Sequence, residues 1–324
     1  MKAIVYSEYG GPEVIRVADI DVPVPADDEI LVRVHAAAVN PLDWHLTRGT
    51  PFPLRAMTGF RAPKKTLRLG ADFAGTVESA GRNVTQFRPG DAVFGGVTTF
   101  GSFAEYVTVP ASLAARKPMR LTFEQAAAAY VGGVTAVRAV RNQGGVQRGQ
   151  TVLINGAAGG VGTFAVQIAK ALDAEVTGVC RTAKLELVRA IGADHVIDYT
   201  REDIVGAQRR YDAIIDIAGS RRLSDLRRVL APTGTLVITG GSGGPWLDGI
   251  ERNLRAFLLS PFGRQRLLAF ISRPRLSDLA ALRDLIESGA VTPAIDRAYP
   301  LSEAAAAVRH LADGHARGKV VISV

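Results

Sequence analysis

A strand, a glycine-rich turn and a helix follow one another in residues 151–170, and this succession constrains the fold more than any other feature. The apolar, β-branched run Thr151–Asn155 leads directly into the turn GAAGGVG at residues 156–162. Apolar residues then recur on one face of the expected helix, at Val161, Ala165, Ile168 and Ala169. Glycines permit a tight turn and a close approach of the backbone to a pyrophosphate, toward which the free N–H groups of the helix start point. The sequence therefore predicts a dinucleotide site here, and a purely structural turn is the alternative.

Strands and helices continue to alternate after this unit. Strands are expected at residues 175–180, 195–197, 211–217 and 234–239, with helices at 162–172, 183–191 and 223–230. This order predicts an α/β domain with a parallel, doubly wound sheet. Further helices are expected at 248–273 and 276–288, and a last strand at 319–324.

Residues 1–121 follow a different pattern. Their alternating or apolar runs are short and are separated by turns rich in proline and glycine, such as Pro89-Gly90-Asp91. The expected strands are residues 2–6, 30–38, 74–80, 92–97 and 103–109. Many short strands with such turns predict a barrel-like β domain. A chain of 324 residues is long enough for this domain and a separate α/β domain.

The chain is basic, with a formal net charge of +8 and arginine pairs at 209–210, 221–222 and 227–228. Two interpretations stay open, a solvated basic face and a surface that binds nucleic acid. We favour the first, because aromatic residues are not interleaved with the basic ones as a stacking platform requires.

Cysteine content and hydropathy exclude several classes of protein. Cys180 is the only cysteine, which rules out an intrachain disulfide and a cysteine-rich zinc cluster. No apolar run has the length of a membrane span, and residues 2–6 already show a strand pattern where a signal peptide would have its basic and apolar regions. A cytoplasmic protein is therefore expected.

The residues after the second strand of the α/β domain indicate which dinucleotide is bound. NAD-binding chains usually place a carboxylate about 20 residues after the glycine turn, where it binds the ribose 2′-hydroxyl. Here that place is taken by Cys180-Arg181-Thr182, with Lys184 close behind. Arginine offers a planar fork of N–H groups to a 2′-phosphate, lysine adds a positive charge, and Thr182 adds a hydroxyl donor. The sequence predicts NADP(H); the alternative is that Arg181 and Lys184 are solvated charges that point away.

Nine motifs spread over the chain carry a family resemblance. They are MKAIVYSEYGGPEVI (1–15), VNPLDWHLTRG (39–49), LGADFAGTVESAG (69–81), FRPGDAVFG (87–95), GSFAEYVTVP (101–110), NGAAGGVG (155–162), IGADHVIDY (191–199), PTGTLVITGG (232–241) and GHARGKVVI (314–322). With these segments in this order, the chain resembles the medium-chain dehydrogenase/reductase superfamily, and within it the zinc-independent NADPH:quinone oxidoreductase-like branch.

The resemblance implies two domains. A GroES-like β-barrel domain is expected at residues 1–121, to which residues 292–324 return, and a Rossmann NADP-binding domain at 122–291. The nicotinamide and the substrate are expected between them, and a homodimer joined through the cofactor domains is expected as in relatives. The apolar region 246–273 is variable in the family and is expected either to form the substrate entrance or to cover a dimer face.

The resemblance also implies the site residues. Asn40 and Thr135 match family residues near the nicotinamide and are the expected catalytic residues; a turn residue and a plain buried hydroxyl are the alternatives. Besides these two, the expected cofactor-binding residues are Gly156, Ala158, Gly159, Gly160, Val161, Cys180, Arg181, Lys184, Tyr199, Ala218, Gly240, Gly241 and Lys319. Lys319 has the alternative of pairing with a carboxylate. Trp44 and Phe257 are expected at the substrate, with core packing as the alternative for Trp44.

Zinc-dependent members of the superfamily hold their metal with cysteine and histidine at places where this chain has Val39-Asn40-Pro41 and Gly70-Ala71-Asp72, so no metal site is expected. Without zinc, conjugate addition of hydride to a quinone or an enone is easier than reduction of a simple ketone, because the charge spreads onto an oxygen that hydrogen-bond donors stabilise.

We therefore expect NADPH-dependent reduction of quinones or α,β-unsaturated carbonyls, with a small-molecule substrate and no nucleic-acid partner. Two alternatives stay open. One is a metal-free NADP-dependent alcohol or aldehyde oxidoreductase, and the other is an NADPH-binding protein whose main role is to bind RNA or a protein partner.

Overall fold

The computed structural model describes residues 1–97, 100–206, 209–239, 256, 264–270 and 276–324. The chain divides into two compact units, the first with Met1–Val131, Pro274–Glu287 and Pro293–Val324, and the second with Gly132–Arg273 and Ser288–Thr292. The first unit also includes residues 122–131 and 276–287. The boundaries predicted from the sequence assign these two segments to the second domain. One reason for their grouping with the first unit is that Glu287 accepts hydrogen bonds from the backbone N of Met119 and, through its own carbonyl, from the guanidinium of Arg120.

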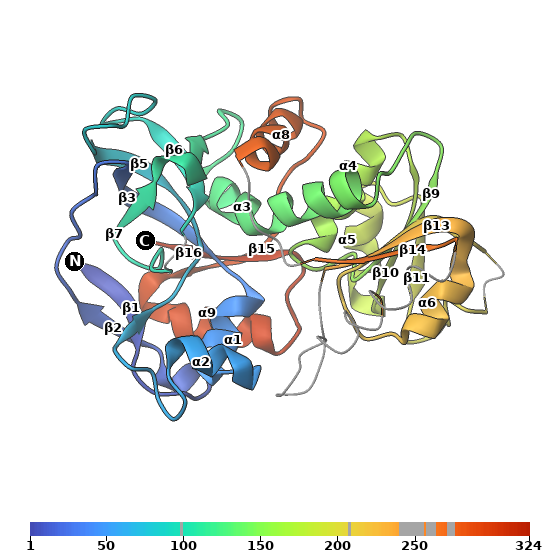
Figure 1. Cartoon of the computed structure of the whole chain (residues 1–324), viewed down its shortest axis with the longest axis horizontal. Helices are drawn as coiled ribbons and strands as arrows, with labels where there is room; N and C mark the ends of the chain where they lie inside the picture. The colour runs from blue at the N-terminus through green and yellow to red at the C-terminus, as the bar shows by residue number, and fades with distance from the viewer. Residues whose placement is uncertain (98–99, 207–208, 240–255, 257–263, 271–275) are drawn as a thin grey trace. The chain divides into compact units, whose positions relative to one another are not determined.

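The first unit is a β domain with a few short helices (Figure 1). Its strands within the described residues are β1 (Lys2–Tyr6), β2 (Arg16–Asp19), β3 (Glu29–Val39), β4 (Leu67–Arg68), β5 (Asp72–Ala80), β6 (Ala92–Gly96), β7 (Tyr106–Pro110), β8 (Ala114–Arg116), β15 (Ile295–Pro300) and β16 (Lys319–Ser323). They form one sheet in the order β2-β1-β4 and a second in the order β15-β16-β3-β5-β6-β8, with β7 also paired to β3. Its helices are α1 (Pro41–Arg48), α2 (Arg55–Thr58), α8 (Leu276–Glu287) and α9 (Ala304–Ala312).

The C-terminal strand lies inside the second of these sheets. β16 pairs in parallel with β15 and antiparallel with β3, in a register that places Val320 opposite Val39 and Ile322 opposite Ala37. The side chain of Ile322 is fully buried in a core that contains Ile4 and Leu46. Residues from the two ends of the chain therefore share one hydrophobic core.

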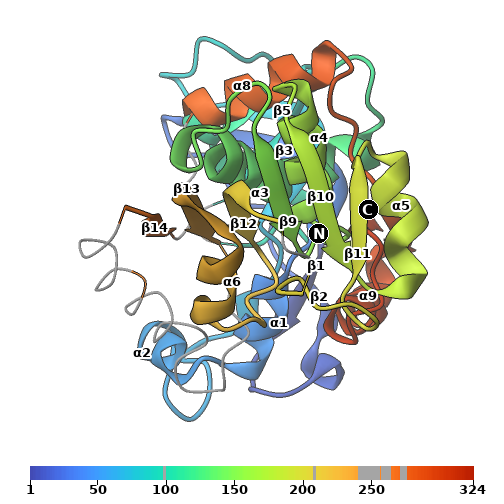
Figure 2. The same cartoon turned by 90° about the vertical axis from the view of Figure 1, so that its right-hand side faces the viewer.

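The second unit is built on a parallel sheet, whose strands lie side by side in Figure 2. The described strands are β9 (Thr151–Asn155), β10 (Glu175–Cys180), β11 (His195–Asp198), β12 (Tyr211–Asp216), β13 (Leu230–Ile238) and β14 (Arg266–Ala269), in the order β11-β10-β9-β12-β13-β14. α4 (Gly162–Ala171) packs on β9 and β10, α5 (Leu185–Ala190) on β10 and β11, and α6 (Leu223–Val229) on β13. Because the strand order reverses between β9 and β12, ligands are expected outside the carboxyl ends of these strands. The predicted parallel, doubly wound sheet is confirmed.

One sequence prediction is wrong in this unit. The sequence pattern predicts a helix over residues 248–273, but Arg266–Ala269 form the parallel strand β14. Leu267 and Leu268 pair with Leu236 and Val237 of β13, so the next strand of the sheet satisfies their backbone groups and buries Leu267. A run of only four residues, three of them apolar, does not distinguish a strand from a buried helix by its pattern alone, so the tertiary pairing decides.

The helix α3 (Phe123–Val137) belongs to both units, because the division falls between Val131 and Gly132. It continues into a π-helical segment, Arg138–Gln143. Within the described residues, no helix combines the length and the hydropathy needed to cross a membrane.

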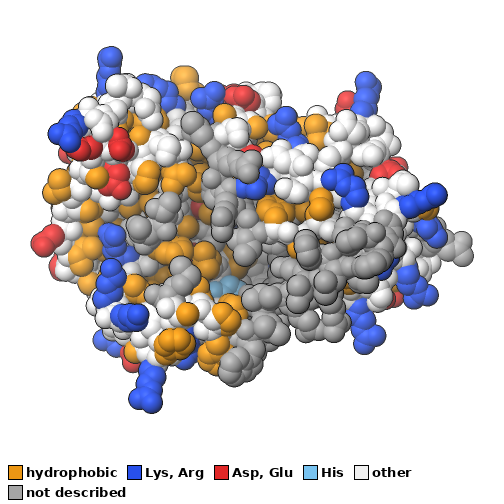
Figure 3. Space-filling model, viewed as in Figure 1, with side chains coloured by type: hydrophobic (Ala, Val, Ile, Leu, Met, Phe, Trp, Pro, Cys, Tyr) orange, Lys and Arg blue, Asp and Glu red, His pale blue; other side chains and the backbone are white. Residues whose placement is uncertain are grey.

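Charged side chains of both signs are interspersed on the face of the molecule that Figure 3 shows. Figure 3 shows Lys and Arg side chains distributed over one face of the molecule with Asp and Glu among them, instead of gathered in one stripe. Ion pairs such as Lys2–Asp19 and Arg82–Asp27 are found among these exposed charges. This distribution favours the solvated basic face over a nucleic-acid surface.

Candidate functional site

The glycine-rich turn connects β9 to α4 and has the geometry of a phosphate cradle. Gly156 has a φ of +92°, and its N–H and that of Ala157 donate to the carbonyl of Val179 on β10. A Cβ atom on Gly162 would lie 2.1 Å from the carbonyl oxygen of Gly156, whereas one on Gly159 would meet nothing closer than 3.5 Å. There is therefore space for a ligand to approach the backbone at Gly159, whereas Gly162 packs directly against the backbone of Gly156.

The start of α4 carries N–H groups that no side chain caps within the described chain. Its N-cap is Val161, which has no oxygen in its side chain. Uncapped N–H groups and the positive end of the helix dipole attract an anion. Gly159, Gly160 and Val161 precede or open this helix, so the structure brings the predicted diphosphate residues together at its N-terminus.

The carboxyl end of β12 lies beside the glycine turn that follows β9. Asn155 ends β9 and Asp216 ends β12, and the Asn155 Nδ2 donates to Asp216 Oδ1 over 2.7 Å. The carbonyl of Asn155 accepts from the backbone N of Ala218 at 3.2 Å. A Cβ on Gly156 would lie 3.1 Å from that same N of Ala218. The predicted residue Ala218 therefore lies against the turn, and the polar pair Asn155–Asp216, which sequence reasoning missed, holds the two strand ends together.

The ends of β10 and β11 bring the predicted cationic residues to one place. Arg181 follows β10, and its Nε donates to the hydroxyl of Tyr199 over 3.2 Å. Tyr199 follows β11, and 45% of its surface is exposed. Lys184 lies in the short helix Thr182–Lys184 that follows Arg181. Three residues predicted at the 2′-phosphate thus come from two neighbouring strand ends.

Cys180 lies directly before Arg181 and is buried. Burial raises the pKa of its thiol to about 11, with the carboxylate of Asp198 acting in the same direction. The thiol is therefore neutral at physiological pH, and this environment is not that of a nucleophile. The backbone carbonyl of Cys180 accepts from the N–H of Tyr199 at 3.1 Å, which fixes the loop after β11 against the end of β10.

A carboxylate also lies at this corner, which sequence reasoning missed. Asp198 ends β11 opposite Cys180, and its side chain is 5% exposed. It accepts hydrogen bonds from the hydroxyl of Thr182 and, over 2.7 Å, from that of Thr200. These donors hold the pKa of Asp198 below its usual range. The hydroxyl of Thr182, expected at the phosphate, is thus directed to Asp198 instead.

A second group of predicted residues forms a buried polar network in the first unit. Lys319, at the start of β16, is 3% exposed, and its Nζ donates to Asn40 Oδ1 at 2.7 Å and to Asp72 Oδ2 at 3.3 Å. The Asn40 Nδ2 donates to Asp72 Oδ2 at 3.1 Å and to the carbonyl of Ala38 at 3.2 Å. Both Nδ2 hydrogens of Asn40 are therefore occupied, and Lys319 pairs with a carboxylate.

Asp43 belongs to the same part of the first unit. Its carboxylate accepts from the backbone N of Asn40 at 2.8 Å and from that of Gly70 at 2.9 Å, so it caps α1 and ties that helix to the segment before β5. Complete burial raises its pKa to about 7, against the effect of the two N–H donors. Burial likewise raises the pKa of Asp72, while the ammonium of Lys319 lowers it.

Thr135 lies on α3, and its side chain is 7% exposed. The same helix touches the glycine turn, because a Cβ on Gly132 would lie 2.5 Å from the carbonyl oxygen of Gly160. Thr135 follows Gly132 by less than one turn. The structure therefore places this predicted residue on the segment that packs against the diphosphate turn.

The remaining predicted residues lie only partly within the described chain. Trp44 lies on α1, is half-buried against the core, and has the guanidinium of Arg48 4.9 Å from its ring centre. Gly240, Gly241 and Phe257 lie outside the described residues. Of the apolar region 246–273, only 256 and 264–270 are described.

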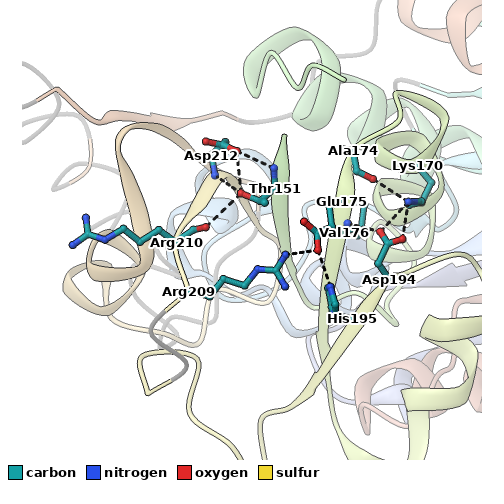
Figure 4. Close-up of polar contacts among 10 residues, drawn as sticks. All are labelled: Thr151, Lys170, Ala174, Glu175, Val176, Asp194, His195, Arg209, Arg210 and Asp212. Atoms are coloured by element: carbon teal, nitrogen blue, oxygen red, sulfur yellow. Dashed lines mark hydrogen bonds and ion pairs between the residues drawn. The ribbon is translucent and has the colours of Figure 1, made fainter. Parts of the chain in front are cut away.

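The opposite, amino edge of the parallel sheet carries polar residues that pair with one another (Figure 4). Glu175 Oε1 accepts from Arg209 Nη2 at 2.6 Å and lies 2.8 Å from His195 Nε2. Lys170 Nζ lies 2.8 Å from Asp194 Oδ2. These side chains satisfy one another, so the edge with the glycine turn is the better candidate for a ligand.

Known proteins match this chain over its whole length. The family models "Alcohol dehydrogenase GroES-like domain" and "Zinc-binding dehydrogenase" match residues 26–119 and 191–322. Quinone oxidoreductase of Homo sapiens is 32% identical over 333 residues, covering 99% of this chain and 97% of that protein. The chain belongs to the medium-chain dehydrogenase/reductase superfamily, in its quinone oxidoreductase branch.

Two further members of the superfamily support this assignment. NADPH-dependent alkenal/one oxidoreductase, chloroplastic, of Arabidopsis thaliana is 34% identical over 340 residues, covering 99% of this chain and 79% of that protein. The crystal structure of Escherichia coli quinone oxidoreductase complexed with NADPH matches with a TM-score of 0.85 and 26% identity, covering 100% of both chains. The expected GroES-like and Rossmann-type folds are confirmed, and the chain is an NAD(P)H-dependent oxidoreductase of the quinone oxidoreductase/alkenal reductase type.

The described side chains around Asp72 do not suit the zinc ion that other members of the superfamily hold. Across the part of the chain that the structure describes, no three His, Cys, Asp or Glu side chains are grouped so that they could hold a metal ion. Asp72 lies where the superfamily's zinc-dependent members have ligands, but the ammonium of Lys319 is 3.3 Å from its carboxylate. A resident cation at that carboxylate repels a second one.

Proposed function

We propose that this chain uses NADPH in preference to NADH and transfers hydride to quinones or α,β-unsaturated carbonyls without a metal ion. The observation that carries the cofactor preference is the junction of Arg181 and Tyr199 at the ends of β10 and β11, with Lys184 in the following helix. A guanidinium, an ammonium and a phenolic hydroxyl suit the charge and oxygens of a 2′-phosphate. The complex of the E. coli relative with NADPH agrees with this preference.

Asp198 does not oppose this proposal. An NAD-binding carboxylate must be free to accept from the ribose 2′-hydroxyl. Asp198 is almost completely buried, and the hydroxyls of Thr182 and Thr200 already donate to it. It therefore orders the loop that presents Tyr199 and leaves the exposed positions to Arg181 and Tyr199.

The bound dinucleotide supplies the hydride, and the chain's own residues bind and orient the reactants. Gly160 and Val161 are the residues we propose to donate backbone N–H groups to the diphosphate at the start of α4, whereas the N–H of Gly159 already donates to the carbonyl of Gly156 at 3.1 Å. Asn40 and Thr135 are the residues we propose at the reacting end. The hydrogen bonds of Asn40 bear on this role, because both hydrogens of its Nδ2 are donated and its Oδ1 already accepts from Lys319.

The test of the substrate class follows the oxidation of NADPH and NADH at 340 nm with 9,10-phenanthrenequinone, an enone and a simple ketone, each with EDTA. We expect turnover of NADPH with the quinone or the enone, undiminished by the chelator. Turnover of the ketone alone would instead favour the alcohol or aldehyde oxidoreductase, and activity lost to EDTA and restored by zinc would overturn metal independence.

The test of the cofactor preference is Arg181→Ala. Loss of one charged phosphate contact is expected to weaken NADPH binding by about 1.5–3 kcal/mol, or about 10- to 150-fold, and NADH binding much less. Arg209→Ala is the matched control, because Arg209 is an arginine of the same unit that pairs with Glu175 at the amino edge. An equal effect of Arg181→Ala on both cofactors would remove Arg181 from the 2′-phosphate.

The expected homodimer stays a prediction, which light scattering on the purified chain tests directly.

A further inference from the structure

One buried carboxylate joins three separate segments of the first unit. Asp72, the first residue of β5, is completely buried. Its Oδ2 accepts from Asn40 Nδ2 at 3.1 Å and from Lys319 Nζ at 3.3 Å, and its Oδ1 accepts from the backbone N of Val131 at 3.1 Å. The carboxylate thus holds the N-cap residue of α1, the first residue of β16 and the middle of α3.

The network leaves Asn40 a single orientation. A donor, Lys319 Nζ, lies 2.7 Å from one end of its amide group, and an acceptor, Asp72 Oδ2, lies 3.1 Å from the other. Rotating the amide by half a turn would place an NH₂ group against the ammonium and a carbonyl oxygen against the carboxylate, and both contacts would be repulsive. Asp72 and Lys319 together therefore determine where the Asn40 oxygen points.

The hydrogen bond from the backbone N of Val131 to Asp72 connects the carboxylate to α3. Val131 is the last residue of the first unit on this helix, and Thr135 follows it by four residues, which is about one turn. A hydrogen bond from a buried carboxylate to the backbone at Val131 therefore fixes the turn of α3 that leads to Thr135.

We propose that Asp72, neutralised by Lys319, is a positioning residue that sets Asn40 and the Thr135 turn of α3 for hydride transfer. This inference rests on the proposed function, in which Asn40 and Thr135 act at the reacting end. Stability alone is a poor explanation for such a pair, because the desolvation of two buried charges offsets most of their attraction. A neutral pair of similar size would serve stability as well, but it would not fix the amide of Asn40 from both ends.

The decisive variant is the double substitution Asp72→Asn with Lys319→Met, compared with each single substitution. Each single variant leaves one buried charge unpaired, so a lowered melting temperature is expected. The double variant removes both charges and is expected to regain most of the melting temperature. Its kcat for quinone reduction is expected to stay about 10- to 100-fold below that of the wild type, as for misplaced reacting groups. Its Kd for NADPH is expected to change by a smaller factor than its kcat, because the proposed phosphate contacts lie in the other unit.

The matched control is Asp194→Asn with Lys170→Met, which removes a partly exposed Lys–Asp pair at the amino edge of the parallel sheet. This control is expected to keep the wild-type kcat. If the double variant at Asp72 and Lys319 regains both the melting temperature and the wild-type kcat, the network serves folding only and the proposal is overturned. The same holds if the single variants keep the wild-type kcat.

A second readout does not depend on turnover. Hydrogen exchange of the Asn40 side-chain amide and of the Val131 backbone amide, followed by NMR in the whole chain, is expected to be slow in the wild type and faster in the double variant. The Asn155 side-chain amide, which donates to Asp216 in the other unit, is the internal control and is expected to remain unchanged. Unchanged exchange at Asn40 and Val131 would overturn the positioning role. A wild type that reduces neither quinone nor enone would instead overturn the proposed function, and the two failures are therefore distinguishable.

Discussion

Gly156, Gly159 and Gly162 serve three different purposes in a single turn. Gly156 adopts a positive φ that a side chain would strain, and Gly162 lies so close to the Gly156 carbonyl that a Cβ would overlap it at 2.1 Å. Gly159 has neither constraint, since a Cβ there would be no closer than 3.5 Å to its nearest neighbour. A glycine that the fold itself does not require indicates a ligand that approaches the backbone.

This difference predicts opposite outcomes for two alanine substitutions. Gly159→Ala is expected to keep the melting temperature of the wild type but to weaken NADPH binding at least about tenfold, because the methyl group occupies the approach of the diphosphate. Gly162→Ala is expected to lower the melting temperature, since the backbone must move to relieve the overlap. Differential scanning fluorimetry and fluorescence titration with NADPH measure both effects. Unchanged NADPH affinity in Gly159→Ala would argue for the purely structural turn.

Asp43 shows how a single buried carboxyl group makes stability depend on pH. The folded chain keeps the proton of this group up to a pH of about 7, whereas the unfolded chain releases it near the ordinary value of 3.8. Between these values the folded state binds more protons than the unfolded state, so raising the pH lowers the free energy of unfolding.

We therefore expect the free energy of unfolding to fall by about 2–4 kcal/mol from this group as the pH rises from 4 to 8. Asp43→Asn is the comparison variant. It is expected to be less stable at low pH, because an amide NH₂ meets the N–H of Asn40 or Gly70, and its stability is expected to change less with pH. Urea denaturation at a series of pH values measures this. The difference between the pH curves of wild type and variant isolates Asp43, because the other carboxyl groups with shifted pKa values, such as Asp72 and Asp194, titrate in both chains. Parallel pH curves for wild type and variant would contradict the role of Asp43.

Among the elements, β16 has the contacts that are hardest to infer from its position in the sequence. It lies between β15 and β3, which are far from each other in the sequence, and it carries both a core residue, Ile322, and the ion-pairing residue Lys319. The end of the chain is thus an interior strand of the first unit's larger sheet. Its backbone groups are satisfied on both sides, so its loss would leave β15 without a partner strand and part of β3 unpaired along one edge.

Truncation of one side chain measures this contribution. Ile322→Ala is expected to lower the free energy of unfolding of the first unit by about 2–5 kcal/mol, because it opens a cavity in a fully packed core. Val324→Ala, one residue beyond the strand and 37% exposed, is the matched control and is expected to change it by less than about 0.5 kcal/mol. Urea denaturation followed by circular dichroism compares the two, and similar effects of both variants would mean that β16 is not an interior strand.

At the scale of the whole molecule, a net charge of +8 raises the question of an RNA partner. The described Lys and Arg side chains are dispersed, and several lie in ion pairs with Asp or Glu, as at Arg116–Asp91 and Arg221–Asp203. Few phosphates of one RNA strand can then be neutralised at once, and the number of neutralised phosphates sets both the affinity and its dependence on salt.

We accordingly expect a labelled single-stranded RNA to bind no tighter than about 1 μM at physiological salt. Fluorescence anisotropy titrations at low and physiological salt, with turnover measured on the same preparation, check this expectation. Nanomolar and steeply salt-dependent binding, together with negligible turnover of quinones and enones, would favour the alternative of an RNA-binding protein.

Some features of this protein follow from the sequence alone because their causes are local. The strand, the glycine turn and the helix between Thr151 and Ala171 are specified by neighbouring residues, and so is the alternation that predicts a parallel sheet. Arg181 and Lys184 follow a strand that the glycine turn locates by counting, so their place after β10 could also be predicted, and their contact with a phosphate stays a prediction. A short run such as Arg266–Ala269 could not be assigned, because only pairing with β13 distinguishes a strand from a helix there.

Only the tertiary structure decided the rest. Lys319 and Asn40 are separated by 279 positions in the chain, and their contact depends on β16 entering the sheet beside β3. The sequence relates Asp72 only to the place of the superfamily's zinc ligands, and it does not distinguish Asp198 from other polar residues near strand ends. Their hydrogen bonds to Val131 and to Thr182 appear only once the elements are packed. Sequence pattern determines elements because they form from near neighbours, whereas a buried polar network is determined by which distant residues the finished fold brings within hydrogen-bond distance.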